Sequence, residues 1–362
     1  MPAEHVAVVS RDAGLVAEVR RLAALVGHTV LVAGQPADSA QVCRNAALVV
    51  VDAKAFELVD ESTPMSEVVV VADDPDRIAL WESALRIGAR RVLTLPAGTA
   101  ELLDLLALVG ERPGPPGPLF AVVGGTGGAG ASVLSVALGW AFGQLRRPTT
   151  VVDLDVHGGG LDVLAGLERV DGLRWDELSG ARGVVASASL REQLPSVDGV
   201  TVLSTSAARD TADVDAPALP DRVAMASVLA AARRGGDVVV ADAPRQCHDD
   251  VSAVLAGCDA ALLVVPAHVR AVSAAAGTAR RLRSLCADIR LVVRADGRAR
   301  LHDDDVARAL ALPHIATVAT DSHITASVDR GQLLQSFRRS SVGRTARVIA
   351  ERLLSDDVEQ AS

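Results

Sequence analysis

The sequence predicts an α/β protein of two domains, each built on a mostly parallel β-sheet. Short apolar runs of strand length alternate with segments whose apolar residues recur at helical spacing, a pattern typical of strands covered on both faces. Residues 110–118, GERPGPPGP, interrupt this alternation, because proline and glycine disfavour both helix and central strand. We therefore expect a first domain at 1–109, a linker at 110–118 and a second domain at 119–362.

The first domain is predicted to be a small parallel α/β unit. Helical spacing is clearest in residues 13–27 and 77–89. Five strand-like runs separate such segments, at 5–10, 29–34, 47–53, 67–73 and 90–96.

The second domain shows the same alternation with more strands. A helix is predicted from residue 131 to 145, and residues 205–220 have so little pattern that we expect a mobile surface loop. The strand-like runs lie at 119–125, 149–155, 200–205, 237–243, 260–266, 289–295 and 315–320.

Composition excludes several functional classes. The apolar runs are too short to span a bilayer, and the N-terminus lacks the pattern of a signal peptide, so we expect a cytoplasmic protein. Four scattered cysteines without a C-x-x-C pair argue against a disulfide framework or a thiolate metal site, and favour reduced thiols. A net charge of -9 and 2% aromatic residues disfavour sequence-specific nucleic-acid binding.

The stretch GGTGGAGAS at 124–132 follows one strand-like run and begins the helix predicted from residue 131. It is either a tight strand-to-helix corner or a phosphate-binding loop, in which backbone N–H groups converge at a helix N-terminus. Acids after later strands favour the second interpretation: Asp153 and Asp155 end one run, and Asp242 ends another. The carboxyl ends of parallel strands share one edge of a sheet, where magnesium and an attacking water would be held.

These motifs resemble the deviant Walker ATPases of the MinD/ParA family across residues 119–355. The family loop K-G-G-x-G-K-[ST] lies over 126–132, its D-x-D switch lies over Asp153 and Asp155, and the L-D that follows lies over Leu161 and Asp162. Its D-x-P switch lies over Asp242 and Pro244.

The resemblance implies a P-loop NTPase domain with ATP and Mg²⁺ as cofactors. Magnesium would be bound at Ser132 and Asp242, and catalysis in an active site would fall to Asp155 and Asp242. Arg294 belongs to the strand segment that contacts the base in this family. The implied nucleotide-binding residues are Gly127, Gly128, Ala129, Gly130, Ala131, Ser132, Asp153 and Arg294.

The two lysines of the family loop are missing. In the family the first reaches across a nucleotide-sandwich dimer and the second neutralises the β- and γ-phosphates, but here they are replaced by Thr126 and Ala131, and Lys54 is the only lysine in the chain. Losing one preorganised donor at developing charge costs about 2.7 to 4 kcal/mol of transition-state stabilisation. We therefore expect hydrolysis to be weak or absent, while the backbone cradle still binds nucleotide weakly.

The first domain resembles a response-regulator receiver, a flavodoxin-like fold, most clearly in GARRVLTLPAGTAELLDLL at 88–106. Asp52 then falls at the phosphoacceptor position and Asp12 near the acidic pocket, but the lysine before the proline is Leu95. A degenerate receiver used for docking or dimerisation, with Asp52 as a strand-end cap, is the favoured interpretation, and regulated phosphorylation is the alternative.

A receiver-like domain joined to this ATPase domain resembles the CpaE/TadZ branch, and GGTGGAGAS with the following LDVHGGGLDVLAGLERVDGLRW resembles its actinobacterial septum site-determining proteins (Ssd). This implies a spatial regulator of septum placement or of polar Flp-type pilus and secretion assembly, recruited to the septum or pole. Partners would be septum or pilus and secretion proteins, and a homodimer is also allowed. The alternative is an active ATPase that cycles between monomer and nucleotide-sandwich dimer.

Other charged segments have simple structural interpretations. The acids in CHDD at 247–250 and LHDDDVARAL at 301–310 are expected to begin helices, where they favour the helix dipole. Apolar spacing in 337–354 predicts a closing helix with its apolar face inward, rather than a membrane-binding helix or a DNA-binding surface. An intrinsic membrane contact is therefore not expected.

Overall fold

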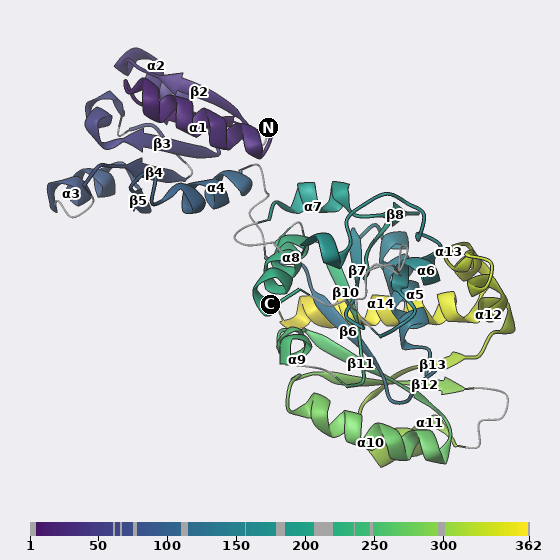
Figure 1. Cartoon of the computed structure of the whole chain (residues 1–362). Helices are drawn as coiled ribbons and strands as arrows, with labels where there is room; N and C mark the ends of the chain where they lie inside the picture. The colour runs from purple at the N-terminus through teal and green to yellow at the C-terminus, as the bar shows by residue number, and fades with distance from the viewer. Residues whose placement is uncertain are drawn as a thin grey trace. The chain divides into compact units, whose positions relative to one another are not determined.

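The computed structural model divides the chain into two compact units that separate between residues 113 and 114, inside the predicted linker (Figure 1). The structure describes residues 5–360 except 61, 66, 75–77, 110–114, 156, 179–184, 206–219, 235, 247–248 and 296–300. The loop predicted at 205–220 lies almost entirely outside the described residues, as do Cys247 and His248.

The first unit is a five-stranded parallel sheet with strand order β2-β1-β3-β4-β5, and all five predicted strands are confirmed. Side chains alternate between two apolar layers: α1 and α4 cover one face, and α2, η1 and α3 the other. The elements are β1 (His5–Val9), α1 (Ala13–Leu25), β2 (Thr29–Ala33), α2 (Pro36–Cys43), β3 (Leu48–Asp52), the 3₁₀ segment η1 (Ala53–Leu58), β4 (Val68–Val71), α3 (Ile78–Arg86), β5 (Arg91–Leu93) and α4 (Thr99–Ala107).

The second unit is an eight-stranded sheet with order β13-β12-β11-β6-β10-β7-β9-β8. Its seven predicted strands are confirmed and run parallel, and a short antiparallel strand, β8, was not predicted. The strands are β6 (Leu119–Gly124), β7 (Thr149–Asp153), β8 (Ser196–Val197), β9 (Val200–Leu203), β10 (Val238–Ala243), β11 (Ala260–Pro266), β12 (Ile289–Ala295) and β13 (His314–Ala319).

Helices connect these strands, and the acidic starts of α9 and α11 confirm the interpretation of the two acidic segments. Within the described residues, no helix combines the length and hydropathy needed to cross a membrane. The helices are α5 (Ala131–Gln144), α6 (Leu161–Ala165), η2 (Trp175–Leu178), α7 (Ser187–Gln193), α8 (Arg222–Arg234), α9 (Asp249–Ala256), α10 (Val269–Arg283), α11 (Asp303–Leu310), α12 (Ser322–Val328), α13 (Leu333–Ser336), η3 (Phe337–Arg339) and α14 (Ser341–Gln360).

Helix α5 lies at the centre of the second unit, packed between the sheet and α14 (Figure 1). Nine consecutive residues of α5, from Leu134 to Phe142, are buried, because the helix is covered on more than one side. Gly139 allows the close approach to the sheet, since a Cβ there would lie 2.3 Å from Val151 Cγ2. The apolar face of α14, formed by Val342, Ala346, Ile349 and Leu353, is buried against this core, which confirms the closing helix.

Candidate functional site

The glycine-rich loop connects the central strand β6 to the N-terminus of α5. Gly128 and Gly130 have φ values of 68° and 94°, a backbone region that favours glycine over residues with a Cβ. Within the described part of the chain, no protein oxygen accepts a hydrogen bond from the N–H groups of Gly127, Gly128 and Gly130. The first turn of α5 adds further N–H groups that have no partner inside the helix. The loop therefore presents a concentration of N–H donors suited to phosphate oxygens.

A cavity of about 740 Å³ opens over this loop. It is lined by every residue from Thr126 to Val133, together with Asp155, Asp242 and Arg294. Six of the predicted nucleotide-binding residues, Gly127 to Ser132, thus lie around one cavity with both predicted catalytic acids. The volume is in the range of small-molecule and cofactor sites. The donors and the volume both suit a nucleoside phosphate.

Asp242 lines this cavity, and two serines of α5 hydrogen-bond its carboxylate. Ser135 Oγ donates to Asp242 Oδ1 over 3.0 Å, and Ser132 also hydrogen-bonds the carboxylate. Burial, assisted by the negative charges of Asp153 and Asp155 and opposed by the serine hydrogen bonds, raises the pKa of Asp242 to about 7. A nearby cation would favour the ionised form.

The residues present are compatible with magnesium. Ser132 and Asp242 supply two protein oxygens, and Mg²⁺ usually keeps several waters and takes its remaining ligands from substrate phosphates. Among the described residues there is no cluster of three or more His, Cys, Asp or Glu side chains arranged to hold a metal on its own. The pair therefore fits a metal that arrives with a nucleotide.

Asp153 lies behind the cavity and fixes the loop that follows β7. Its Oδ1 accepts the N–H of Asp155 at 3.0 Å, and its Oδ2 accepts the N–H of Leu161 at 2.9 Å and Ser204 Oγ at 3.0 Å. Burial raises the pKa of Asp153 to about 6, while these three bonds oppose the shift. Although it was predicted to bind nucleotide, Asp153 is not among the cavity-lining residues; it positions Asp155, which is.

Sequence reasoning missed the side chains that support this loop. Trp175 is fully buried and donates from Nε1 to the Asp153 carbonyl oxygen at 2.6 Å. Arg174, 6% exposed, donates from Nε to Asp162 Oδ2 at 3.0 Å and binds loop carbonyls with its remaining nitrogens. The D-x-D and L-D motifs are therefore joined through buried polar contacts. No spacing in the sequence indicates Ser204, which lies 51 residues from its partner Asp153.

The positions where the family resemblance places lysines lie on the cavity wall. Thr126 and Ala131 both line it, and neither carries a charge. The cationic groups in the lining include Arg245, which is exposed just after Pro244, and Arg294 at the end of β12. Arg294 Nη1 donates to the carbonyl oxygen of Gly128 at 2.6 Å, so its guanidinium lies against the glycine-rich loop.

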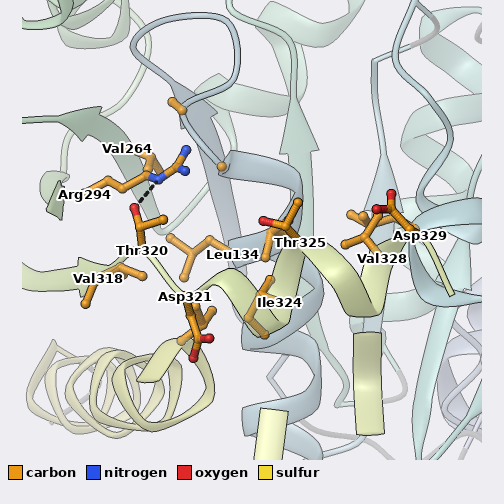
Figure 2. Close-up of a pocket in the computed structure, with 16 residues that line it drawn as sticks. Leu134, Val264, Arg294, Val318, Thr320, Asp321, Ile324, Thr325, Val328 and Asp329 are labelled. Carbon is orange, nitrogen blue, oxygen red and sulfur yellow. Dashed lines mark hydrogen bonds between the residues drawn. The ribbon is translucent and has the colours of Figure 1, made fainter. Parts of the chain in front are cut away.

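A smaller apolar pocket of about 230 Å³ adjoins the cavity, and the two share Ala129, Gly130, Val133, Leu164 and Arg294. Figure 2 shows residues that line it, among them Leu134, Ile324 and Arg294, with Arg294 bonded to Thr320. An apolar pocket that continues a donor-rich cavity suits a ligand with one flat apolar end and one anionic end. Residues 296–298, which complete the segment expected to contact the base, lie outside the described residues.

Asp52 lies at the end of β3 in the first unit, 7% exposed and bonded within its own chain. Ser10 Oγ donates to Asp52 Oδ2 at 2.7 Å, and the N–H of Lys54 donates to Oδ1 at 2.9 Å. The carboxylate thus caps η1, as the strand-end-cap interpretation predicts. Lys54 Nζ pairs with Asp73 at 2.6 Å, and Asp12 caps α1.

Comparisons with known proteins support both halves of this description. A family model described as the Rv3660c-like, CheY-like N-terminal domain matches residues 9–117. The uncharacterized protein Rv3660c of Mycobacterium tuberculosis (strain H37Rv) is 34% identical over 342 residues, or 93% of this chain and 94% of that protein. The similarity to this relative therefore extends over both units.

Solved structures resemble the second unit at lower identity. The ParA family ATPase from Chlorobium tepidum has a TM-score of 0.54 and 14% identity, covering 66% of this chain and 98% of its own. The septum site-determining protein MinD of Pyrococcus horikoshii, in complex with Mg-ADP, has a TM-score of 0.54 and 18% identity, covering 65% and 95%. The predicted fold class, a CheY-like domain followed by a MinD/ParA-like domain with a mostly parallel sheet, is confirmed.

Proposed function

The chain belongs to the Rv3660c-like family, and on that premise we propose that its second unit is a nucleotide-binding platform with little capacity to hydrolyse ATP. One observation carries the proposal: the cavity keeps its N–H donors, Ser132 and Asp242, but has no lysine at Thr126 or Ala131. These groups would bind phosphates and position a metal. The groups that would stabilise charge on a moving γ-phosphoryl are missing.

Each remaining residue has a defined part in nucleotide binding. Backbone N–H groups from Gly127 to Ser132 would bind phosphate oxygens, and the apolar pocket beside Leu134 would exclude water from the other end of the ligand. Ser132 and Asp242 would hold Mg²⁺, which would neutralise phosphate charge when bound. Asp155, fixed by Asp153, faces the same cavity and would orient a water.

The platform would act as a spatial regulator of septum placement or of polar pilus and secretion assembly. Support comes from the MinD/ParA-like fold and from the P. horikoshii relative of that fold, which is a septum site-determining protein. Its partners would be septum or pilus and secretion proteins, and nucleotide binding would favour a homodimer. A cytoplasmic location with recruitment to the septum or pole is part of this proposal.

An active ATPase that cycles between monomer and nucleotide-sandwich dimer is the second candidate. It is favoured by Asp155 and Asp242, which line one cavity and are both held by hydrogen bonds in their loops or strands. The two candidates differ in the rate of ATP hydrolysis, which should be near background for the platform and robust for the cycling ATPase.

Phosphate release separates them. Wild type is assayed at high enzyme concentration with ATP and Mg²⁺, beside Asp155→Ala and Asp242→Ala, after ATP binding has been measured by titration. We expect weak ATP binding and a release rate near background. Robust turnover that both variants abolish would establish the cycling ATPase instead, and no binding at millimolar ATP would refute the nucleotide platform.

The regulatory role is tested in cells. A fluorescent fusion expressed at several dosages should concentrate at the septum or pole, and changed dosage should alter cell length, septum number or pilus output. Uniform fluorescence at every dosage, with none of these altered, would contradict the spatial role.

A further inference from the structure

Arg294 lines both the cavity over the glycine-rich loop and the apolar pocket beside it. The resemblance assigns its segment to the nucleotide base, but its guanidinium bonds the glycine-rich loop: Nη1 donates to Gly128 O at 2.6 Å, and Nε donates to Thr320 Oγ1 at 3.3 Å. Its side chain also lies over Gly130, where a Cβ would stand 3.6 Å from Nη1. Neither hydrogen bond uses Nη2.

We propose that Arg294 supplies the positive charge that neutralises the outer phosphates of a bound nucleotide, in place of the two missing lysines. The proposal rests on nucleotide binding by this cavity. Arginine is permanently charged and presents a planar fork of donors that matches phosphate oxygens. Here the fork approaches from β12, across the loop, rather than from inside the loop as a lysine would.

The charge balance of the cavity supports this role. Asp155 and Asp242 line it, and a triphosphate would add further negative charge beside them. Arg245 also lines the cavity but is exposed, whereas Arg294 is partly buried and fixed by two hydrogen bonds. A fixed cation loses less side-chain freedom on binding an anion, so Arg294 should contribute more than Arg245.

The test compares two variants that remove the same charge from the same cavity, Arg294→Gln and Arg245→Gln. ATP, ADP and AMP are titrated with Mg²⁺ into the full chain, and thermal unfolding checks that each variant folds. We expect Arg294→Gln to weaken ATP binding about tenfold or more, the scale of a charged hydrogen bond, and AMP binding far less. Arg245→Gln should weaken ATP binding less, and Arg294→Lys should recover part of the loss.

A second comparison tests whether Arg294 replaces the lysine that is missing at position 131. In the Ala131→Lys background, Arg294→Gln should weaken ATP binding less than it does in wild type, because the new lysine also neutralises the phosphates. If Arg294→Gln weakens the binding of AMP and ATP equally, Arg294 contacts the base or sugar instead, and the proposal is wrong. It also fails if Arg294→Gln binds ATP like wild type. If wild type itself binds no ATP, the proposed nucleotide platform falls together with this role.

A separate observation concerns two cysteines that the sequence left unpaired. Cys258 follows α9 and Cys286 follows α10, 28 residues apart, yet Cys258 Sγ lies 3.4 Å from Cys286 Sγ. Cys286 is buried and Cys258 is partly exposed, so a small oxidant can reach the pair from one side. Cys43, in the first unit, is buried and bonded to Ser39.

We infer that Cys258 and Cys286 form an intramolecular disulfide under peroxide. One thiolate sulfur attacks the O–O bond of hydrogen peroxide, becomes a sulfenic acid and releases hydroxide, which takes a proton to become water. The second thiol then displaces the sulfenic hydroxyl as water, and the S–S bond forms. The two sulfurs together lose two electrons, which reduce the peroxide to two waters.

The disulfide would close a loop beside the start of β6. Asp259, next to Cys258, accepts the N–H of Leu119 at 2.7 Å and pairs with Arg233 at 3.0 Å, and Arg233 Nε donates to Gly117 O at 2.7 Å. Oxidation would therefore stiffen the segment that anchors Gly117 and Leu119. Because closing a loop constrains the unfolded chain, oxidised protein should melt on the order of 5 °C higher.

Intact mass and peptide mapping test the bond in a Cys43→Ser, Cys247→Ser background, which leaves only this pair. Peroxide should lower the intact mass by about 2 Da, the two hydrogens lost in forming one disulfide, and yield one linked peptide. Dithiothreitol should reverse the change, and Cys286→Ser should prevent it. Stepwise addition of oxygen without a linked peptide, or only intermolecular dimers, would refute the inference.

Discussion

Two sites in this chain lie at the carboxyl ends of parallel strands, and each lacks the lysine of the family it resembles. In the first unit, Asp52 is nearly enclosed and accepts hydrogen bonds from Ser10 and Lys54 of its own chain. In the second unit, the glycine-rich loop still faces a cavity of about 740 Å³, with N–H groups directed to no protein acceptor among the described residues. Both sites thus lack a lysine, yet one is closed and the other is open.

The difference teaches that a missing lysine does not by itself define a degenerate site. What matters is whether groups of the chain itself fill the hydrogen-bonding positions that a bound phosphate or phosphoryl group would use. Around Asp52 they do, because Ser10 and a backbone N–H donate to the carboxylate, which caps η1. Around Gly128 they do not, and Arg294 on β12 places a cation beside the loop.

Restoring lysine to the open site should have the largest effect. Thr126→Lys with Ala131→Lys should tighten ATP binding and raise turnover about 10²-fold or more, the scale of one recovered preorganised donor. Phosphate release under saturating ATP and Mg²⁺ measures it. Adding Asp155→Ala should return the rate to background; a gain that survives this change would place the chemistry elsewhere.

The pH dependence of stability should show how much the buried carboxylate of Asp242 destabilises the folded protein. Burial raises the pKa of Asp242 from 3.8 to about 7, so folding takes up a proton between these values, and the charged carboxylate costs stability as pH rises through them. At pH 8, Asp242→Asn should therefore have a higher melting temperature than wild type. Its free energy of unfolding should be larger by up to about 1.4 kcal/mol per unit of pKa difference. The advantage should vanish below pH 4.

Thermal unfolding from about pH 3 to pH 8 measures this advantage, and Mg²⁺ with ATP provides the control. Because a bound cation favours the ionised carboxylate, these ligands should stabilise wild type at pH 8 more than they stabilise Asp242→Asn. Equal melting temperatures of the two proteins across the whole pH range would show that Asp242 is not strained by burial.

The sequence predicted most of the architecture and the position of the open site. Twelve strand-like runs became strands, because runs such as 260–266, AALLVVP, are apolar throughout, as expected of strands covered on both faces. The cavity residues from Gly127 to Ser132 were identifiable because acids after later strands favoured a phosphate-binding loop over a tight strand-to-helix corner. The two-residue strand β8 was missed, since two residues carry no periodicity.

Long-range side-chain contacts could not be predicted. The resemblance assigned nucleotide binding to Asp153 and catalysis to Asp155, but β7 directs Asp153 into the core towards Ser204 and leaves Asp155 at the cavity. Cys258 and Cys286 are far apart in the sequence. They meet because Cys258 precedes β11, Cys286 precedes β12, and these two strands pair side by side. Such contacts depend on register between strands, which no single segment encodes.

In the closed site, removing the carboxylate should cost stability but not nucleotide binding. Asp52→Ala would leave the hydroxyl of Ser10, itself 2% exposed, without its acceptor, and would remove the cap of η1. We expect a loss of about 1–3 kcal/mol, measured by denaturant unfolding of the full chain. ATP titration should be unchanged. Asp52→Asn, which keeps an acceptor oxygen, should lose less stability than Asp52→Ala.

The smallest expected effect comes from giving the closed site its lysine. Leu95→Lys is the counterpart of the loop restoration, yet it should produce no labelling by radioactive acetyl phosphate. Attack on phosphorus requires a carboxylate oxygen that is free and exposed to the phosphoryl donor, and both Asp52 oxygens are bonded within a nearly buried site. A cation alone would not open it. Ser10→Ala combined with Leu95→Lys frees one oxygen, so labelling should appear there first if it appears at all. Labelling of wild type that disappears in Asp52→Asn would mean that the first site is open as well, and the contrast between the two units would fail.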